Sequence, residues 1–408
     1  MKRYETYKDS GIQWWEEIPT HWDLKKAKHI FSLVTENVSD SSLPKIALEN
    51  IESWTGKYIE TNSDFMGEGV EFKKDDILFG KLRPYLAKVY KAEFAGQAVG
   101  DIYVFRGNEE QNPEYLKYLL LSYPFISVVD GSTYGAKMPR ANWDFISHLV
   151  LPCPPKTEQV TIAAFLDHKV GQIDATIAEK EQMLEDLKNY RSAIISEAVT
   201  KGLDKNVEMK DSGIDKFPMI RSNWNTSKLK YIASIRSGSA LPINNIKKDA
   251  LYEVYGGNGC MGRADEYNTE SPAIIIGRVG ALCGNVHLIK TKKWVTDNAL
   301  ILNIKRDVTY EYLYYYLTAY DLNTLNSSNA QPLITGTKVL DVVTPMPSLN
   351  EQIMIANYLD DKTSMIDETI DQITVQIVEL KSYKSALITE AVTGKIDLRE
   401  WKPKEENV

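Results

Sequence analysis

The chain has 408 residues, enough for two to four domains, because a single hydrophobic core stops growing well below that size. Its 43% hydrophobic and 25% charged residues exclude a disordered chain, and the net charge of −8 argues weakly against nucleic-acid binding unless basic residues cluster locally. No apolar run reaches the length of about 18 residues that a membrane span needs, and the N-terminus has no apolar signal core. We therefore expect a cytoplasmic protein.

Cysteine and histidine are too scattered to form a common type of site. Cys153, Cys260 and Cys283 form no CxxC pair, so neither a disulfide framework nor a zinc site is expected. The histidines show no paired ligand spacing. The chain also lacks a GxxxxGK[ST] loop, a GxGxxG fingerprint and a GxSxG motif. We expect a binding or assembly protein rather than an enzyme, with no cofactor and no metal ion in this chain.

An internal repeat organises the chain. Residues 8–12, KDSGI, recur as residues 210–214 at an offset of 202. A second block, residues 190–200, recurs as residues 383–393 at an offset of 193, with eight of eleven pairs identical. Two such blocks in the same order predict two tandem copies of one unit of about 200 residues.

Each copy is expected to begin with a mixed part and to end with a helical part. In the mixed part, short apolar runs flanked by Gly, Asn and Asp are typical of strands, and one longer run has helical spacing. In chain order these are strands at 76–79 and 102–105, a helix at 114–120, strands at 273–276 and 299–302, and a helix at 311–317. The pattern predicts two α+β domains rich in irregular loops.

The helical part of each copy carries one narrow apolar stripe with near-heptad spacing. Because neither helix can bury its stripe alone, we expect the two to pair as an antiparallel coiled coil. The alternative is that each stripe packs on its own domain. Lys180 lies in the first stripe and is expected to help fix the register. The predicted pairing residues are Ile173, Ile177, Leu184, Leu187, Ile366, Ile370, Ile373, Ile377 and Leu380, and Tyr190, Ile194, Tyr383 and Leu387 continue the stripes.

Basic residues are not concentrated on either mixed part as a whole. Residues 22–155 hold 15 Lys and Arg against 18 Asp and Glu, and residues 222–347 hold 13 against 10. Any DNA-binding face must therefore be local. The strongest cluster follows the predicted strand at 76–79 and consists of Lys81, Arg83, Tyr85 and Lys88 around Pro84. Arg can bind guanine through two hydrogen bonds, Lys can neutralise phosphate, and Tyr can bind phosphate or stack.

The matching stretch of the second copy is glycine-rich. Residues 277–285 offer Arg278 and Asn285 as hydrogen-bonding side chains, and their glycines let the backbone approach a ligand closely. Further DNA-binding candidates are Lys137 with Arg140, and Asn258 with Arg263. The alternative for each candidate is a solvated surface residue. Cys283 is expected to be a packed small side chain rather than a nucleophile.

Both copies carry a motif series that resembles the specificity (S) subunits of type I restriction–modification systems. The series is YKDSGI with a following P-x-H-W, then P-x-P-P, E-Q, L-D and I-D, and finally YRSAIISEAVTKGL. Residues 47–57 and 255–280 are also similar to the target-recognition domains of that family. The second copy has residues 216–218, KFP, where the first has residues 14–16, WWE, so we expect that contact to be remade or lost.

The resemblance implies that each mixed part is a target-recognition domain reading one half of a split, asymmetric sequence in double-stranded DNA. The helices would hold the domains apart and dock two modification (methyltransferase) subunits. This chain would be non-catalytic, while its partners use S-adenosylmethionine and, where a restriction subunit is present, ATP and Mg²⁺. The implied segments are residues 1–155 (first recognition domain), 156–205 (first helical spacer), 206–348 (second recognition domain) and 349–408 (second spacer and tail).

The helix length fits such a spacing role. A helix over residues 173–199 spans about 40 Å, close to the roughly 34–36 Å of one DNA turn that separates half-sites in dimeric proteins. We therefore predict two short half-sites about one turn apart. A stand-alone DNA-binding regulator and an enzyme such as a nuclease on a similar scaffold stay open as alternatives.

Overall fold

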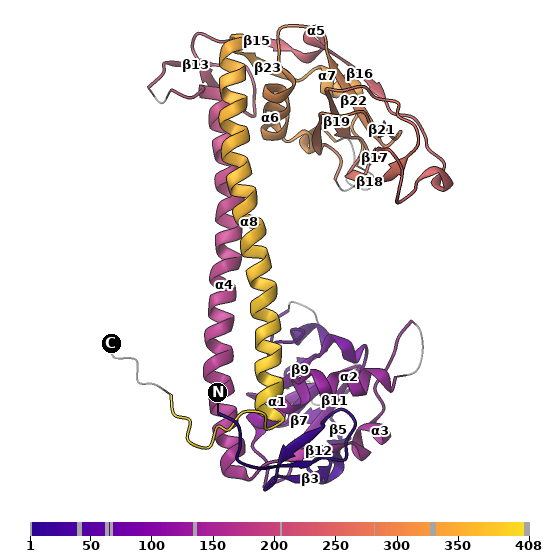
Figure 1. Cartoon of the computed structure of the whole chain (residues 1–408), viewed down its shortest axis with the longest axis vertical. Helices are drawn as coiled ribbons and strands as arrows, with labels where there is room; N and C mark the ends of the chain where they lie inside the picture. The colour runs from indigo at the N-terminus through magenta and orange to yellow at the C-terminus, as the bar shows by residue number, and fades with distance from the viewer. Residues whose placement is uncertain are drawn as a thin grey trace. The chain divides into compact units, whose positions relative to one another are not determined.

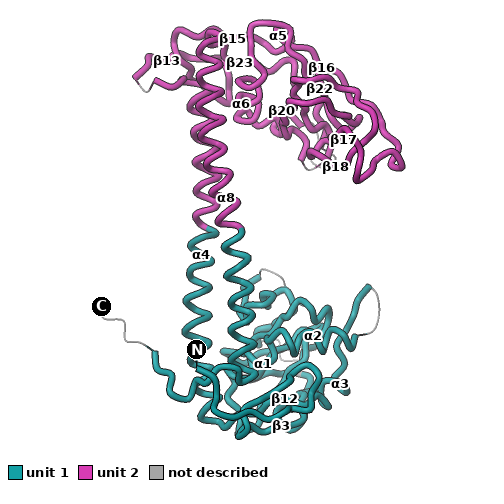
Figure 2. The backbone as a smooth tube through the Cα atoms, in the orientation of Figure 1, with its two compact units in different colours: residues 1–181, 375–408 teal, residues 182–374 magenta. Residues whose placement is uncertain are grey.

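The structure is a computed structural model that describes residues 2–38, 43–61, 65, 68–133, 137–204, 206–280, 282–326 and 332–403. The chain divides into two compact units, residues 1–181 with 375–408 (unit 1) and residues 182–374 (unit 2) (Figure 2). Their boundaries fall inside two long helices, α4 (Lys156–Lys201) and α8 (Leu349–Val392). The division differs from the four predicted segments because part of each long helix packs with each domain.

Unit 1 contains two four-stranded sheets, in the orders β4-β11-β8-β9 and β5-β7-β10-β6, and the strand pairs β1-β2 and β12-β3. The predicted strands at 76–79 and 102–105 correspond to β8 and β11. Before α4, the elements in chain order are β1 (Tyr7–Asp9), β2 (Glu17–Pro19), β3 (Asp23–Lys26), η1 (Ala27–His29), β4 (Phe31–Val34), β5 (Asn37–Val38), β6 (Lys45–Ile46), η2 (Leu48–Asn50), β7 (Gly69–Phe72), β8 (Ile77–Gly80), η3 (Pro84–Leu86), β9 (Val89–Lys91), β10 (Gly96–Ala98), β11 (Ile102–Gly107), α1 (Pro113–Leu121), α2 (Tyr123–Gly131), α3 (Trp143–His148) and β12 (Val150–Cys153).

Unit 2 contains a four-stranded sheet in the order β16-β22-β19-β20, a three-stranded sheet in the order β18-β17-β21, and the pairs β13-β14 and β15-β23. The predicted strands at 273–276 and 299–302 correspond to β19 and β22. Before α8, the elements are β13 (Met209–Asp211), β14 (Met219–Arg221), β15 (Asn225–Lys228), α5 (Leu229–Ile232), β16 (Ala233–Ser237), η4 (Ile243–Asn245), β17 (Tyr252–Gly256), β18 (Gly259–Ala264), β19 (Ala273–Gly277), β20 (Val286–Ile289), β21 (Trp294–Val295), β22 (Ala299–Ile304), α6 (Tyr310–Tyr320), η5 (Leu322–Leu325), α7 (Gly336–Leu340) and β23 (Val343–Met346).

The main sheets of the two units have the same topology. β4, β11, β8 and β9 correspond to β16, β22, β19 and β20, and every neighbouring pair is antiparallel. The central strands β8 and β19 are fully buried, as their continuous apolar sequences require. The repeat seen in the sequence is therefore a repeat of one fold.

In each unit, α4 and α8 lie side by side (Figure 1). In unit 1 they run antiparallel, because Asp174 bonds Lys384 while Lys180, further along α4, bonds Gln376, earlier in α8. In unit 2, Arg191 of α4 forms two hydrogen bonds with Asp367 of α8. The predicted α+β class with two long paired helices is confirmed.

The predicted pairing residues lie on the inner faces of the helices. Ile173, Ile177, Ile366, Ile373 and Ile377 are buried, and Leu184, Leu187, Ile370 and Leu380 are half-buried. Tyr190 and Tyr383, which continue the predicted stripes, are instead 54% and 53% exposed. At this point along each helix the buried positions are the following Ile194 and Leu387, because the helix turns a different face toward its neighbours.

The glutamine of the repeated Glu-Gln pair joins each long helix to its domain through two hydrogen bonds. Gln159 accepts a hydrogen bond from the Asn112 amide and donates to the Pro154 carbonyl. Gln352 repeats both contacts, with the amide of Thr309 and the carbonyl of Pro347. The C-terminal end of each long helix contacts the domain of the other copy. The Tyr115 hydroxyl donates to the Val392 carbonyl of α8 in unit 1, and the Tyr312 hydroxyl donates to the Val199 carbonyl of α4 in unit 2.

Residues 216–218, where the second copy differs from residues 14–16 of the first, form a different buried aromatic contact. Trp15 is buried in the first copy, and Phe217 at the equivalent position is buried and packs against Tyr316 and Tyr320.

Within the described ranges, no helix combines the length and apolar character that crossing a bilayer demands. The same ranges hold no group of three His, Cys, Asp or Glu side chains close enough to bind a metal ion.

Candidate nucleic-acid interface

Two candidate loops occupy the same place in the two domains. Residues 81–88 connect β8 to β9, and residues 278–285 connect β19 to β20. Both loops are closed by the same backbone bond, from Gly80 to Lys88 at 2.8 Å and from Gly277 to Asn285 at 2.9 Å. The two stretches matched in the sequence are thus equivalent loops with different side chains.

Arg83 adopts a left-handed backbone conformation, and the equivalent position of the second loop is occupied by a glycine, Gly280. The φ angle is +50° at Arg83 and +86° at Gly280, and both amides donate to a proline carbonyl, of Pro139 and Pro332 respectively. A side chain in this conformation costs about 1–2 kcal/mol. The Arg83 side chain is exposed and has no hydrogen bond or ion pair with any residue of the described ranges. It is therefore available to a ligand although its backbone is strained.

Four other candidates lie near this arginine. Tyr85 is 47% exposed, and Lys137 is exposed. Arg140 forms two 3.0 Å hydrogen bonds with Asp101, and the Lys81 ammonium lies 3.8 Å from the same carboxylate. We call Lys81, Asp101 and Arg140 the Asp101 clasp. The clasp joins the start of the loop to residues 137–140, so it brings five predicted DNA-binding residues to one surface.

Lys88 is engaged inside the domain. Its ammonium donates to the carbonyls of Leu48 at 2.6 Å and Ile51 at 2.7 Å. The side chain is half-buried, and this burial lowers the pKa of Lys88. In this geometry Lys88 holds the turn at residues 48–51 against the loop, rather than presenting its charge to a phosphate.

In unit 2, three of the four candidates gather at one end of the main sheet. Asn285 lies within 3.5 Å of Asn258, which sits in the turn between β17 and β18. Arg278 follows directly on Gly277, where a Cβ atom would come within 2.3 Å of the Gly257 carbonyl oxygen. Glycine is therefore required at position 277 to bring the two segments together.

Arg263 is not part of this group. Its guanidinium donates to the carbonyls of Ala250 and Leu251 and lies 3.9 Å from Glu253, its cross-strand neighbour. Arg263, a candidate together with Asn258 in the sequence, therefore binds the segment before β17 instead of joining the other three candidates. Cys283 is buried, as expected of a packed small side chain.

Three polar residues near the predicted Arg278, namely Ser237, His287 and Thr296, had no signal in the sequence. Buried polar atoms without a partner in the described part of the chain include Arg278 Nε, His287 Nε2 and Thr296 Oγ1. Burial lowers the pKa of His287, so its imidazole is neutral at neutral pH. Ser237 lies 3.4 Å from the Arg278 guanidinium. None of these residues belongs to a motif, and only the folded sheet brings them near the loop.

The Asp101 clasp is expected to make stability depend on pH. The hydrogen bond from Arg140 lowers the pKa of Asp101. The clasp therefore stabilises the fold fully above the unfolded-state pKa of about 3.9, and this contribution is lost as the pH falls through the lower folded-state pKa. Urea denaturation of Asp101→Asn and the unsubstituted chain should differ most at neutral pH and converge in strong acid. An equal difference at pH 7 and in strong acid would contradict this.

The structure therefore contains two domains of the same topology, whose equivalent loops carry different side chains and which are joined to a pair of long helices. The family model for the type I restriction modification DNA specificity domain matches residues 23–188 and 221–379. The chain belongs to this family, and the family predicted from the motifs is confirmed.

Curated relatives agree with this assignment. The EcoprrI specificity subunit of Escherichia coli is 31% identical over 162 residues, and the EcoDI specificity subunit of the same species is 25% identical over 189 residues. These matches span 38% and 42% of the two proteins. The putative MjaX specificity subunit of Methanocaldococcus jannaschii is 22% identical over 440 residues, covering 96% of this chain and 98% of that protein. These relatives are all specificity subunits, which does not favour a stand-alone regulator.

Solved structures share the fold. A chain from a type I R-M system, described for its complex assembly and conformational transition, has a TM-score of 0.73 at 16% identity and covers 93% of this chain and 99% of that chain. The HsdS subunit of Thermoanaerobacter tengcongensis has a TM-score of 0.51 at 17% identity, covering 93% and 98%.

Proposed function

We propose that this chain is the specificity subunit of a type I restriction–modification system and recognises a bipartite, asymmetric DNA site, one part with each domain. The observation that carries the proposal is the pair of equivalent loops, 81–88 and 278–285, which share backbone hydrogen bonds but differ in side chains. A common frame with different side chains suits the reading of two different short sequences. Arg83 would contact a base edge in one part of the site, and Arg278 with Asn285 in the other.

The partners follow from the same proposal. The two repeats offer similar docking faces, which suits two methyltransferase subunits and, where the system restricts DNA, ATP-dependent restriction subunits. S-adenosylmethionine, ATP and Mg²⁺ would serve these partners in the cytoplasm. This chain would supply no catalytic group, so the pure chain is expected neither to cleave plasmid DNA nor to methylate it when Mg²⁺ and S-adenosylmethionine are added.

Methylation-aware sequencing of the host genome tests the proposal directly. We expect one interrupted adenine-methylated motif that disappears when the gene for this chain is deleted and returns with the unsubstituted gene. A genome whose methylation pattern is unchanged by the deletion would overturn the proposal. Co-purification gives a second test, since a stand-alone regulator would bring down no methyltransferase.

Shortening the helices tests their spacing role. Deleting residues 178–184 and 374–380 keeps the register of the Asp174–Lys384 and Arg191–Asp367 pairs, which lie outside both deletions. Each helix loses about 10 Å, or roughly three base pairs of DNA. We expect the preferred gap between the two half-sites to shorten by about this amount. Binding should also weaken, because removing roughly three base pairs rotates one half-site around the DNA axis relative to the other. An unchanged gap would exclude the spacing role.

A further inference from the structure

A short loop of the first domain, residues 52–57, lies between the helix pair of unit 1 and the loop at 81–88. The backbone closes on itself, since Ile51 pairs with Tyr58 and the Glu52 amide donates to the Lys57 carbonyl at 3.0 Å. Trp54 and Gly56 both have positive φ angles, of +64° and +74°. The loop at 52–57 is therefore a defined structure with a tightly specified tip.

On one side this loop is bonded to the proposed DNA-reading loop. The Trp54 amide donates to the Ala87 carbonyl at 3.1 Å, and the Trp54 indole donates to the Tyr85 carbonyl at 3.1 Å. Lys88 adds two bonds to the carbonyls of Leu48 and Ile51, just before the loop. A displacement of residues 52–57 would therefore move the backbone on both sides of Leu86, directly after Tyr85.

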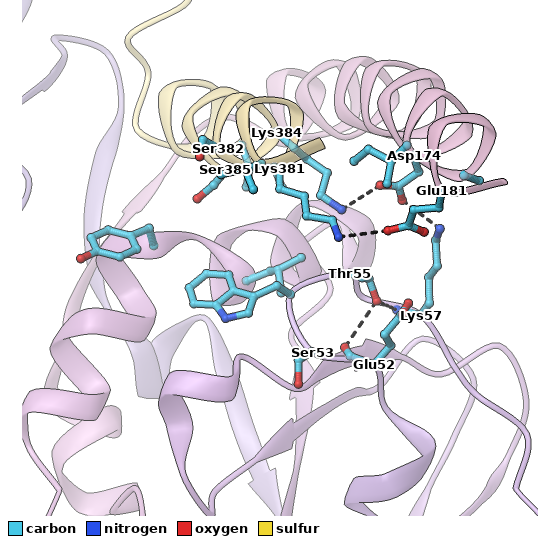
Figure 3. Close-up of a pocket in the computed structure, with 17 residues that line it drawn as sticks. Glu52, Ser53, Thr55, Lys57, Asp174, Glu181, Lys381, Ser382, Lys384 and Ser385 are labelled. Carbon is cyan, nitrogen blue, oxygen red and sulfur yellow. Dashed lines mark hydrogen bonds and ion pairs between the residues drawn. The ribbon is translucent and has the colours of Figure 1, made fainter. Parts of the chain in front are cut away.

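On the other side, one side chain connects the loop to the helices (Figure 3). The Lys57 ammonium lies 2.9 Å from Asp174 of α4, and the same carboxylate accepts a 2.8 Å bond from Lys384 of α8. The side chains of Asp174 and Lys384 are only 14% and 10% exposed. Burial alone would raise the pKa of Asp174, but hydrogen bonds from Lys384 and Lys57 outweigh it and lower the pKa. Both lysines thus engage one ionised carboxylate.

A cavity of about 630 Å³ lies beside this connection, between the loop at 52–57 and the two helices. Trp54, Tyr123 and Ile177 are among the residues that line it. Figure 3 shows Lys381 and Ser385 on the helical side. Because this space is open, the Lys57 ion pair bridges a gap that side-chain packing does not fill. The loop can therefore shift if the ion pair is lost.

The second copy keeps the ion pair between the helices, but its link to the domain is a side-chain hydrogen bond between Arg191 and Tyr314 of α6. Asp367 and Arg191 stand at the positions equivalent to Asp174 and Lys384. In the described part of unit 2, Asp367 forms an ion pair with Arg191 alone. Among the described residues, the carboxylate shared by a lysine of the domain and a lysine of the helices is a feature of the first copy.

We propose that Lys57 is a positioning residue that couples the helix pair to the first DNA-reading loop. The inference rests on the proposed function and deepens it. Through Asp174 and Trp54, Lys57 fixes the orientation of the loop at 81–88 relative to the helices. Recognition of the first half-site, and the precision of its distance from the second, depend on this connection.

The test compares Lys57→Met with Lys381→Met. Both replace a half-exposed lysine by an uncharged chain of similar length. Lys381, however, pairs with Glu181 on the helices and forms no hydrogen bond or ion pair with the described residues 52–57. Each full-length variant, purified with its co-purifying partners, selects duplexes from a random DNA library. We expect Lys57→Met to lower the preference for the first half-site and for one gap length by about twofold to thirtyfold, the usual range for residues along a coupling network. Lys57→Arg should restore both preferences, and Lys381→Met should keep them.

Hydrogen exchange at the Trp54 amide separates failure of this inference from failure of the proposed function. Exchange should accelerate in Lys57→Met and not in Lys381→Met, whether or not DNA is bound. If the unsubstituted protein selects no interrupted motif, the proposed function fails, and the exchange data alone decide whether the connection exists. If the motif is selected but Lys57→Met behaves like Lys381→Met in both measurements, the coupling role is wrong.

Discussion

Arg83→Gly is expected to remove discrimination at the first half-site while leaving the domain at least as stable as before. The equivalent position is Gly280, so the loop backbone already accommodates glycine there. Losing a bidentate arginine contact to a base costs about 1–3 kcal/mol, or roughly fivefold to 150-fold in discrimination. Relief of the left-handed strain offsets the greater flexibility of glycine in the unfolded chain. Binding to duplexes with single substitutions in each half-site measures the discrimination.

Arg83→Ala is the matched control for the backbone. Alanine removes the same guanidinium but keeps a Cβ atom at a φ of +50°. Both variants should lose the same recognition, and the glycine variant should be more stable by about 1 kcal/mol in urea denaturation. If Arg83→Gly still discriminates among bases at the first half-site, Arg83 does not read DNA, while the assignment of the chain to its family is unaffected.

Ile366→Asp is expected to disrupt the attachment of α8 in unit 2. Ile366 is 7% exposed and belongs to the core that contains Ile194, Leu313 and Leu359. An unpaired carboxylate there should lower the free energy of unfolding by about 3–5 kcal/mol, because the charge is buried without a partner. Denaturation followed by circular dichroism measures the loss, and the variant should fail to bind both half-sites together.

Met365→Asp provides the matched comparison on the same helix. Met365 is 62% exposed, so its substitution should change stability by no more than about 1 kcal/mol. Equal effects of the two substitutions would mean that the inner face of α8 does not support the unit. Equal binding by Ile366→Asp and the unsubstituted chain would contradict the proposed role of the helices.

The regular parts of the fold could be predicted because they depend on local patterns. The predicted strands at 76–79, 102–105, 273–276 and 299–302 are central strands of the two main sheets, where buried apolar runs are continuous. The helix predicted over 173–199 is shorter than α4, which begins at Lys156. The earlier residues Ile162, Leu166 and Val170 are also buried and continue the spacing of the stripe back from Ile173. The apolar stripe therefore extends closer to the start of α4 than the predicted helix does.

The candidate site was less predictable because charge in a sequence does not reveal burial. Lys88 and Arg263 look like ligand-binding residues in the sequence, but they donate to backbone carbonyls of their own domains. One signal was available: Arg83 aligns with Gly280, and Ala87 with Gly284, and all four have positive φ angles. Glycine in one copy can thus identify a left-handed position in the other. Lys57 carried no comparable signal, since its partner Asp174 is far away in the sequence.

The shared backbone of the two equivalent loops has an evolutionary consequence. The two loops differ in sequence, RPYLA at 83–87 and GALCG at 280–284, but corresponding backbone bonds at Gly80 and Gly277 close both of them. Pro84, Ala87 and Cys283 are buried, but Arg83, Tyr85 and Leu282 are exposed. Mutations can alter these exposed side chains while the chain still folds. New target preferences can therefore arise by stepwise drift in these loops, with selection acting on which genomic sites are protected rather than on folding.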